Sequence, residues 1–470
     1  MATFGVTPTI LPYSRAMKRS LLVFTFVLLI ASNLSSTPTD ARRAAAIDRE
    51  MQRLAGEIAF WPGYEPLTIP LAIYTGEATY LFRHPAPPED FVGGRFPGRH
   101  PAVTSNSSAE IGGVMTATLL ADGPRAELPA RTQAAVALHE AFHVFQRKNH
   151  PHWIGNEGDL FLYPFEDGEQ LALRRRETEA LRRGLAAEDA TAATCWIRRA
   201  LEARQERFAK LAEPFRAYER GNEWNEGLAQ YIQEVAAGQT TMEFPGAGFG
   251  ATELRLRFYT VGPALAFLLD RFRDDWKAAL EADDQQPLDA LLAAAVAPPE
   301  GAQGNDSACA FTTAELEALA ATARADAAQV VQARIAARQS FDALPGKRVV
   351  IEAGSDQPLW PQGFDPLNVQ QVEGGLLHTR FLRLGNEHGE FLAVDGEEAD
   401  LTLFTVAAGE HPLFNGVRRA EIAGLTGLEV TEGEEEGTIT LKAPGLTAQF
   451  KGAAIRQEGE AVRLSLVGAF

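Results

Sequence analysis

The sequence predicts an α+β protein in which a small N-terminal sheet and a mainly helical middle part precede an all-β C-terminal region. Three patterns predict it: strand-like runs at 67–74, 78–82 and 111–120, helix-forming composition over 129–345, and short alternating apolar and polar runs over 347–470. The change of pattern near Gly346 predicts a domain boundary there. The last region is expected to form a sandwich or a barrel.

Length and composition limit the possible classes of protein. The chain has 470 residues, of which 46% are hydrophobic and 23% charged, close to the globular average, and this excludes extended disorder. Such a length predicts two or three domains. Its formal net charge is −18, with 62 acidic against 44 basic residues. Because an acidic surface repels phosphate backbones, no nucleic-acid partner is expected.

The N-terminal region has the pattern of a secretory signal peptide, expected over 1–36. A basic cluster begins at Met17, which is the expected start, and the apolar run 21–30 and small polar residues follow it. This run is shorter than the roughly 20 residues that a membrane-spanning helix needs. The pattern predicts a secreted or periplasmic protein without a stable membrane span, and an uncleaved anchor is the alternative.

Export changes the interpretation of Cys195 and Cys309, the only two cysteines. Exported proteins meet an oxidising environment in which disulfides persist. One bridge would close a loop of about 114 residues and stabilise the fold by roughly 4–5 kcal/mol in the chain-entropy model. Two separate buried thiols are the alternative, and the sequence leaves both open.

A metal-binding pattern lies at 139–143, where the residues read His-Glu-Ala-Phe-His. The surrounding segment 130–146 has strong helix formers and no internal Gly or Pro. A helix places His139 and His143 one turn apart on one face, so both imidazoles can bind one ion. Glu140 then lies beside the ion, where it can accept a proton from water. The alternative is a surface helix with two solvated histidines.

Two later segments extend this pattern. Residues 224–231 read Trp-Asn-Glu-Gly-Leu-Ala-Gln-Tyr, and residues 259–262 read Tyr-Thr-Val-Gly. With these motifs the chain resembles the gluzincin metallopeptidases, especially the aminopeptidases related to leukotriene hydrolase, over about residues 105–275. The resemblance implies a zincin-like fold, one Zn²⁺ per chain, Glu226 as third ligand and Tyr259 as hydrogen-bond donor to the oxyanion. A core tyrosine is the alternative role for Tyr259.

The chain departs from this family in two places. Glu226 follows His143 by far more than the family's spacing of about twenty residues, which implies a helical insertion at about 150–221 and leaves Glu177, Glu179 and Glu223 as rival ligands. In the strand at 113–117, the family's Glu and Asn are absent. Without that Glu no group is evident to anchor a substrate amine, so an endopeptidase is slightly favoured over an aminopeptidase.

The sequence therefore predicts an exported zinc-dependent peptidase in which Zn²⁺ activates a water and Glu140 is the general base. The expected peptidase domain covers 37–345, and the expected all-β domain covers 346–470. Its partner would be a peptide or protein substrate. The alternative is a non-catalytic envelope or cell-surface binding protein with a degenerate peptidase domain and a β binding module.

Overall fold

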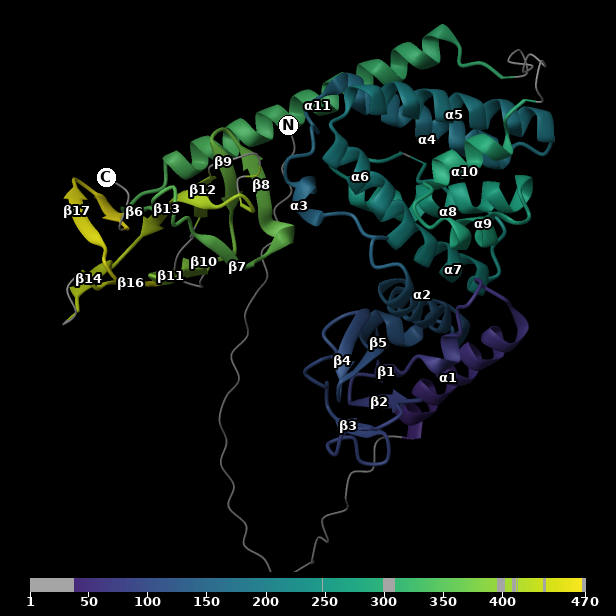
Figure 1. Cartoon of the computed structure of the whole chain (residues 1–470), viewed down its shortest axis with the longest axis horizontal. Coiled ribbons are helices and arrows are strands. Elements are labelled where there is room, and N and C mark those ends of the chain that lie inside the picture. The colour runs from purple at the N-terminus through teal and green to yellow at the C-terminus, as the bar shows by residue number, and fades with distance from the viewer. Residues whose placement is uncertain are drawn as a thin grey trace, which may run out of the picture.

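The computed structural model describes residues 38–246, 248–298, 309–394, 402–407, 411, 413–433 and 437–466. The expected signal peptide over 1–36 lies outside these residues. Among the helices that the structure describes, none combines the length and the apolarity that a membrane span requires. The described chain mixes helix and sheet and ends in a β region, as the sequence predicts (Figure 1).

The N-terminal part is a five-stranded sheet packed against two helices. Its strand order is β3-β2-β1-β5-β4, and only β1 and β5 pair in parallel. Apolar side chains of α1 and α2 form one core with β1 and β5, so these helices cover one face (Figure 1). The elements are α1 (Pro38–Glu57), β1 (Leu71–Tyr74), β2 (Ala78–Phe82), β3 (Arg95–Pro97), β4 (Ser107–Ile111), β5 (Val114–Leu120) and α2 (Ala130–Asn149).

The strand predicted over 111–120 is wrong in part, because the chain reverses direction inside it. Gly112 and Gly113 have φ angles of 55° and 77°, in the left-handed region that glycine adopts without steric penalty. They form the turn of the hairpin between β4 and β5. The strand predicted over 67–74 likewise begins only at Leu71, because Pro66–Thr68 forms a 3-10 turn.

The middle part is helical. A pair of long helices, α4 and α5, lies within the insertion predicted at 150–221, and α11 runs along α4 towards the C-terminal β region (Figure 1). The elements are α3 (Glu157–Leu160), α4 (Gly168–Ala186), α5 (Ala190–Lys210), α6 (Glu213–Asn222), the π-helical turn η3 (Glu223–Gly227), α7 (Leu228–Ala237), α8 (Leu254–Phe272), α9 (Trp276–Ala282), α10 (Leu288–Ala295) and α11 (Thr313–Asp342).

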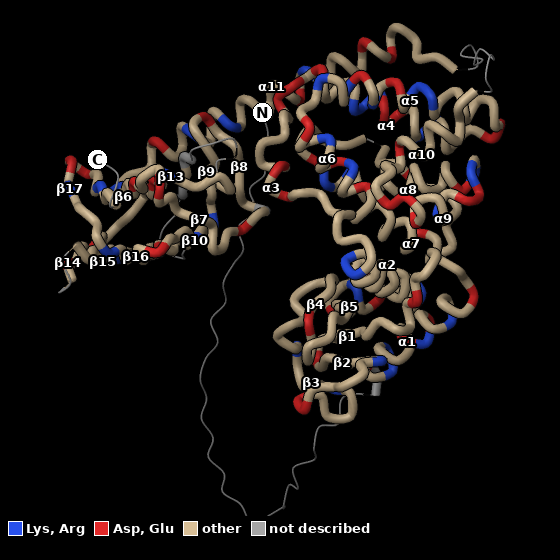
Figure 2. Tube along the Cα trace, viewed as in Figure 1, with Lys and Arg blue, Asp and Glu red and all other residues tan. Residues whose placement is uncertain are grey.

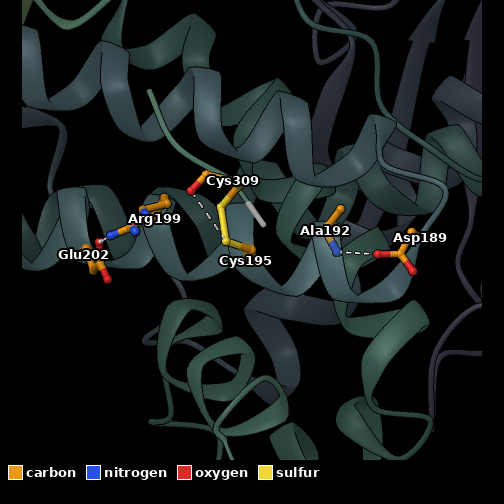
Figure 3. The surroundings of a disulfide bond; sticks show 6 residues. All are labelled: Asp189, Ala192, Cys195, Arg199, Glu202 and Cys309. Carbon is orange, nitrogen blue, oxygen red and sulfur yellow. Dashed lines mark hydrogen bonds and ion pairs between the residues drawn. A yellow bond between two sulfur atoms is a disulfide. The ribbon is translucent and has the colours of Figure 1, made fainter. Parts of the chain in front are cut away.

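A disulfide joins Cys195 of α5 to Cys309, in the segment that leads to α11 (Figure 3). The sequence left a bridge and two free thiols open, and the structure has the bridge. It encloses 114 residues of sequence. This covalent loop contains α6, η3, α7 and α8, which supply half of the site described below.

The C-terminal part is built from two β-sheets that share one apolar core. The change from helix to strand occurs between Asp342 and Lys347, next to Gly346. One sheet has the order β17 (Ala454–Glu458), β18 (Ala461–Ser465), β6 (Lys347–Glu352), β13 (Val417–Leu425), β12 (Thr402–Ala407), β9 (Gly375–His378), β8 (Val369–Val372). The other has β14 (Glu429–Glu432), β15 (Ile439–Ala443), β16 (Leu446–Phe450), β11 (Gly389–Val394), β10 (Phe381–Asn386), β7 (Trp360–Phe364).

Candidate metal centre

Helix α2 places the two histidines of the metal-binding pattern on one face. His139 and His143 are 6% and 8% exposed, and their Nε2 atoms lie 3.1 Å apart. One helical turn separates them, and the periodicity of the helix therefore aligns their side chains. The helix predicted over 130–146 is correct and extends to Asn149.

Glu226 reaches the same point from η3. Its Oε2 atom lies 3.4 Å from Nε2 of His143 and 3.9 Å from Nε2 of His139. A π-helical turn carries an extra residue per turn, and such turns occur frequently at functional sites. Within the residues that the structure describes, these three side chains are the one group of His, Cys, Asp or Glu whose donor atoms converge in this way.

The arrangement fits a tetrahedral zinc ion. Two donor atoms that each lie about 2.1 Å from such an ion are about 3.4 Å apart, close to the three separations above. Two imidazoles and one carboxylate form a donor set that zinc enzymes use. Among the described residues no fourth ligand joins the group, which leaves a position for a water or a substrate. The side chains of His143 and Glu226 also keep about a tenth of their surface exposed.

Gln146 orients His143 and joins two helices. Its Oε1 atom lies 2.9 Å from Nδ1 of His143 and can accept a hydrogen bond from it, which would leave Nε2 free to bind a metal. Its Nε2 atom donates to the carbonyl oxygens of Trp224 and Asn225, at 2.8 and 3.1 Å. The amide thus connects α2 to η3 beside Glu226. In the sequence, the one signal for this role is that Gln146 follows His139 by seven residues and so lies on the same helical face.

The charges of two of the three candidate ligands suit a cation. The third is His143: its burial disfavours the charged imidazole, but the hydrogen bond and the charge of Glu226 raise its pKa. Burial alone would raise the pKa of Glu226, but His143 and the neighbouring groups lower it to about 2. Burial, together with the neighbouring His143, lowers the pKa of His139 to about 3. An ionised carboxylate therefore lies beside an imidazole that is neutral at physiological pH. Both are the forms that bind metal ions.

Glu140 lies beside this group without belonging to it. Its side chain is buried, and burial, opposed in part by His143, raises its pKa to about 7. A carboxylate whose pKa is close to neutrality is well matched to accepting a proton and then donating it. These properties suit a general base, and that role of Glu140 stays a prediction.

Tyr259 joins the site from α8. Its ring is parallel to that of His139, with 6.3 Å between the ring centroids. Burial raises the pKa of its hydroxyl above the ordinary value, and the Glu226 carboxylate beside it adds to the effect. The hydroxyl consequently stays protonated and can donate a hydrogen bond. All five residues that the sequence proposes for the site are thus close together.

Arg255 is a neighbour of the site that no sequence motif indicates. Its Nη2 atom lies 3.6 Å from Oε1 of Glu226, and its Nη1 atom donates to Oε2 of Glu157 at 3.0 Å. No motif includes this residue, and its position four residues before Tyr259 on the same helix is the only sequence signal. It adds a partly exposed positive charge at the edge of the site.

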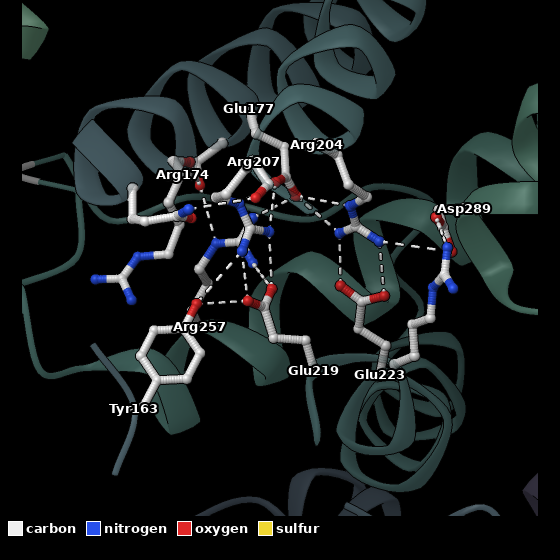
Figure 4. A network of polar contacts seen from close by, with 12 residues as sticks. Tyr163, Arg174, Glu177, Arg204, Arg207, Glu219, Glu223, Arg257 and Asp289 are labelled. Atoms are coloured by element: carbon white, nitrogen blue, oxygen red, sulfur yellow. Dashed lines mark hydrogen bonds and ion pairs between the residues drawn. The ribbon is translucent and has the colours of Figure 1, made fainter. Parts of the chain in front are cut away.

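The three rival carboxylates lie elsewhere. Glu179 is on the outer face of α4, where it pairs with Arg182 and Arg183. Glu177 and Glu223 are buried and pair with arginines, so neither is available to a metal bound by the histidines (Figure 4). Among the sequence candidates for the third ligand, the structure thus brings only Glu226 to the histidines.

A buried network of charged side chains supports η3. Basic and acidic residues are interspersed along α4 and α5 (Figure 2). Arg204 of α5 donates to both Glu177 of α4 and Glu223 of η3, at 2.6 to 3.0 Å (Figure 4). Because Glu223 precedes Glu226 by three residues, the inserted helices hold the turn that carries the third candidate ligand. The buried members are Glu177, Arg204, Arg207, Glu219, Glu223 and Arg257.

No protein-family model, curated protein or solved structure matches the chain. The resemblance to gluzincins therefore stays a prediction that rests on short motifs. The function of the chain is accordingly inferred from the residues that converge on the candidate metal centre.

Proposed function

We propose that the chain is an exported, zinc-dependent peptidase in which His139, His143 and Glu226 hold the metal. The observation that carries this proposal is the convergence of the two Nε2 atoms and one carboxylate oxygen, with Glu140 beside them. A structural zinc site would have a fourth protein ligand and usually cysteines. Both cysteines of this chain are joined to each other instead.

Each side chain of the site has its own role in the proposed hydrolysis. A bound zinc ion would supply a Lewis acid that acidifies water and polarises the scissile carbonyl. Glu140 accepts the proton of the attacking water and passes it to the leaving amine. Tyr259 donates a hydrogen bond to the oxygen that gains negative charge. Gln146 keeps His143 in the required orientation.

A peptide substrate is supported by the sheet that lies beside α2. Strand β5 lies inside this sheet, and β4 next to it forms the edge. An unpaired strand edge binds extended peptides through main-chain hydrogen bonds. Since the free end of a peptide is not needed for such pairing, endopeptidase activity is favoured over aminopeptidase activity.

Export is supported by the disulfide between Cys195 and Cys309, since such bonds persist in oxidising compartments. The expected signal peptide gives the route, and the mature chain would act in the periplasm or outside the cell. Neither the site nor the acidic chain offers a reason to expect a nucleic-acid partner.

Metal analysis combined with hydrolysis of a peptide library tests the proposal. We expect about one zinc per chain, retained in Glu140→Gln while hydrolysis falls at least 10²-fold, on the order expected for loss of a general base. Glu226→Ala should lose zinc, whereas Glu179→Gln, the matched control on α4, should keep both zinc and activity. Unchanged hydrolysis in Glu140→Gln would contradict the proposed mechanism. Absence of both zinc and hydrolysis would favour the non-catalytic binding protein.

A further inference from the structure

A cavity lies beside the buried charged network, and Arg257 belongs to both. It has a volume of about 610 Å³, within the range of sites for small molecules. Helices α4, α8 and α11 and the segment before α8 line it. Its apolar wall includes Phe244, Phe249 and Leu319. None of the residues proposed for metal binding or hydrolysis lines it.

Four arginines line this cavity, and three of them have acidic partners. Arg257 donates to Glu177 at 2.6 Å, and Arg182 donates to Glu179 at 2.6 Å. Arg175 pairs with Asp326 at the rim. Each of these positive charges is therefore matched by a carboxylate within hydrogen-bonding distance.

Arg174 is the exception. It is 4% exposed, and its hydrogen bond from Nη2 to the carbonyl oxygen of Ala251 is the only one that its side chain makes to the described residues. Among those residues no carboxylate lies within ion-pair distance of it. Tyr163 and, farther than ion-pair distance, Glu219 favour its charge, whereas the like charges of Arg257 and Arg207 oppose it. Burial lowers its pKa to about 10, so it stays charged at neutral pH. Burying a charge that forms no ion pair lowers the stability of the folded protein strongly.

We propose that the cavity binds a small monocarboxylate with an apolar body, whose carboxylate pairs with Arg174. The planar guanidinium suits a carboxylate, and its Nε and Nη1 atoms have no hydrogen-bond partner among the described residues. Phe244, Phe249 and Leu319 would contact the apolar body. The single positive charge of Arg174 is neutralised by one negative charge. The acidic groups Glu179 and Asp326 at the rim would repel a dianion such as phosphate more strongly than a monocarboxylate.

Calorimetric titration of the full chain with benzoate, benzamide and inorganic phosphate tests this inference independently of the proposed peptidase function. We expect benzoate to bind once per chain and at least about 10-fold more tightly than the neutral benzamide, because only benzoate pairs with the guanidinium. Phosphate should bind more weakly than benzoate. Dialysis against a chelator should leave benzoate binding unchanged, because the proposed site contains no metal ion. Benzoate bound to a metal ion would instead be lost with the ion.

Two variants locate the site. Arg174→Gln should reduce the preference for benzoate over benzamide to about twofold or less, whereas Arg182→Gln, on the same cavity wall, should keep it. If Arg174→Gln does not fold by circular dichroism, Arg174→Lys takes its place and should weaken benzoate binding by about 10-fold while keeping the preference. The inference is overturned by no benzoate binding, by equal binding of benzamide or phosphate, by loss of binding with the chelator, or by equal effects at the two arginines.

Discussion

Gly227 and Gly262 meet where η3 crosses α8, and their backbones are in direct contact. A Cβ atom on Gly227 would lie 2.7 Å from the Cα atom of Gly262, and one on Gly262 would lie 2.3 Å from the Cα atom of Gly227. No side chain fits at either position without separating the two helices. Since Glu226 precedes one glycine and Tyr259 lies a turn before the other, this crossing sets how closely the two side chains approach.

Gly262→Ala should therefore disturb both stability and metal binding. The added methyl group must push η3 away from α8, and overpacking of this kind destabilises by about 1–3 kcal/mol. Zinc affinity, measured by competition with a chelating dye, should fall as Glu226 moves away from the histidines. Gly56→Ala in α1, where an added Cβ meets nothing within 4 Å, should keep or slightly raise stability. A fully stable, zinc-binding Gly262→Ala protein would show that the crossing is not critical.

Tyr259→Phe separates transition-state stabilisation from metal binding. It removes only the hydroxyl, and loss of one donor to an oxyanion lowers kcat about 10²- to 10³-fold. Zinc content should not change, since Tyr259 is not among the proposed ligands. Tyr74→Phe is the matched control, because the Tyr74 hydroxyl donates to the carbonyl of Gly76 in the N-terminal sheet. Equal kcat values for both variants would assign Tyr259 to the core instead.

Glu177 and Glu179 lie two residues apart on α4 and should respond very differently to substitution by Gln. Glu177 pairs with Arg204, Arg207 and Arg257 and is fully buried. Removing its charge leaves buried guanidinium groups unmatched, which destabilises by about 3–5 kcal/mol. Glu179→Gln should change the free energy of unfolding by less than about 0.5 kcal/mol, as for other surface positions. Urea denaturation measures both, and similar values would contradict the importance of the buried network.

His378 should make the C-terminal β region sensitive to acid. It is fully buried in β9, neither ring nitrogen has a hydrogen-bond partner among the described residues, and burial lowers its pKa from 6.5 to about 4. The unfolded chain takes up a proton below pH 6.5, whereas the folded chain does so only near pH 4. Stability should therefore fall between these values, by about 3 kcal/mol in total.

His378→Leu tests this dependence on pH. The variant has no proton to take up at this position, so its unfolding free energy should vary less between pH 7 and pH 4 than that of the natural chain. His388→Gln, at a partly exposed position in the same region, should retain the full loss. A loss of stability that is the same in His378→Leu would assign the acid sensitivity to other groups.

Local patterns in the sequence predicted the features that depend on residues close together in the sequence, such as single helices. The periodicity of 130–146 predicted α2, and helix geometry then placed His139 and His143 on one face. The run at 111–120 misled, because its two glycines are enclosed by apolar residues and hide a hairpin turn. Strands as short as β3, three residues long, leave too little pattern to detect.

Contacts between distant segments could not be predicted from spacing. A motif favoured Glu226 over Glu177 and Glu223, because each of the three is far enough along the chain from His143 to reach the histidines in some fold. The partners of Arg204 and the missing partner of Arg174 arise only when α4, α5 and α8 pack together. A charge on an amphipathic helix has the same sequence pattern whether it turns outward to water or inward to a carboxylate.

Some residues of the candidate metal centre lie inside the loop that the disulfide closes, and the others lie outside it. Glu226 and Tyr259 belong to the covalently closed ring between Cys195 and Cys309, whereas His139 and His143 lie on the open strand of polypeptide before it. Choice of production host consequently matters. Synthesis in a reducing cytosol would leave the ring open and give up its entropic restraint on the unfolded chain, so preparations intended for metal loading belong in an oxidising compartment.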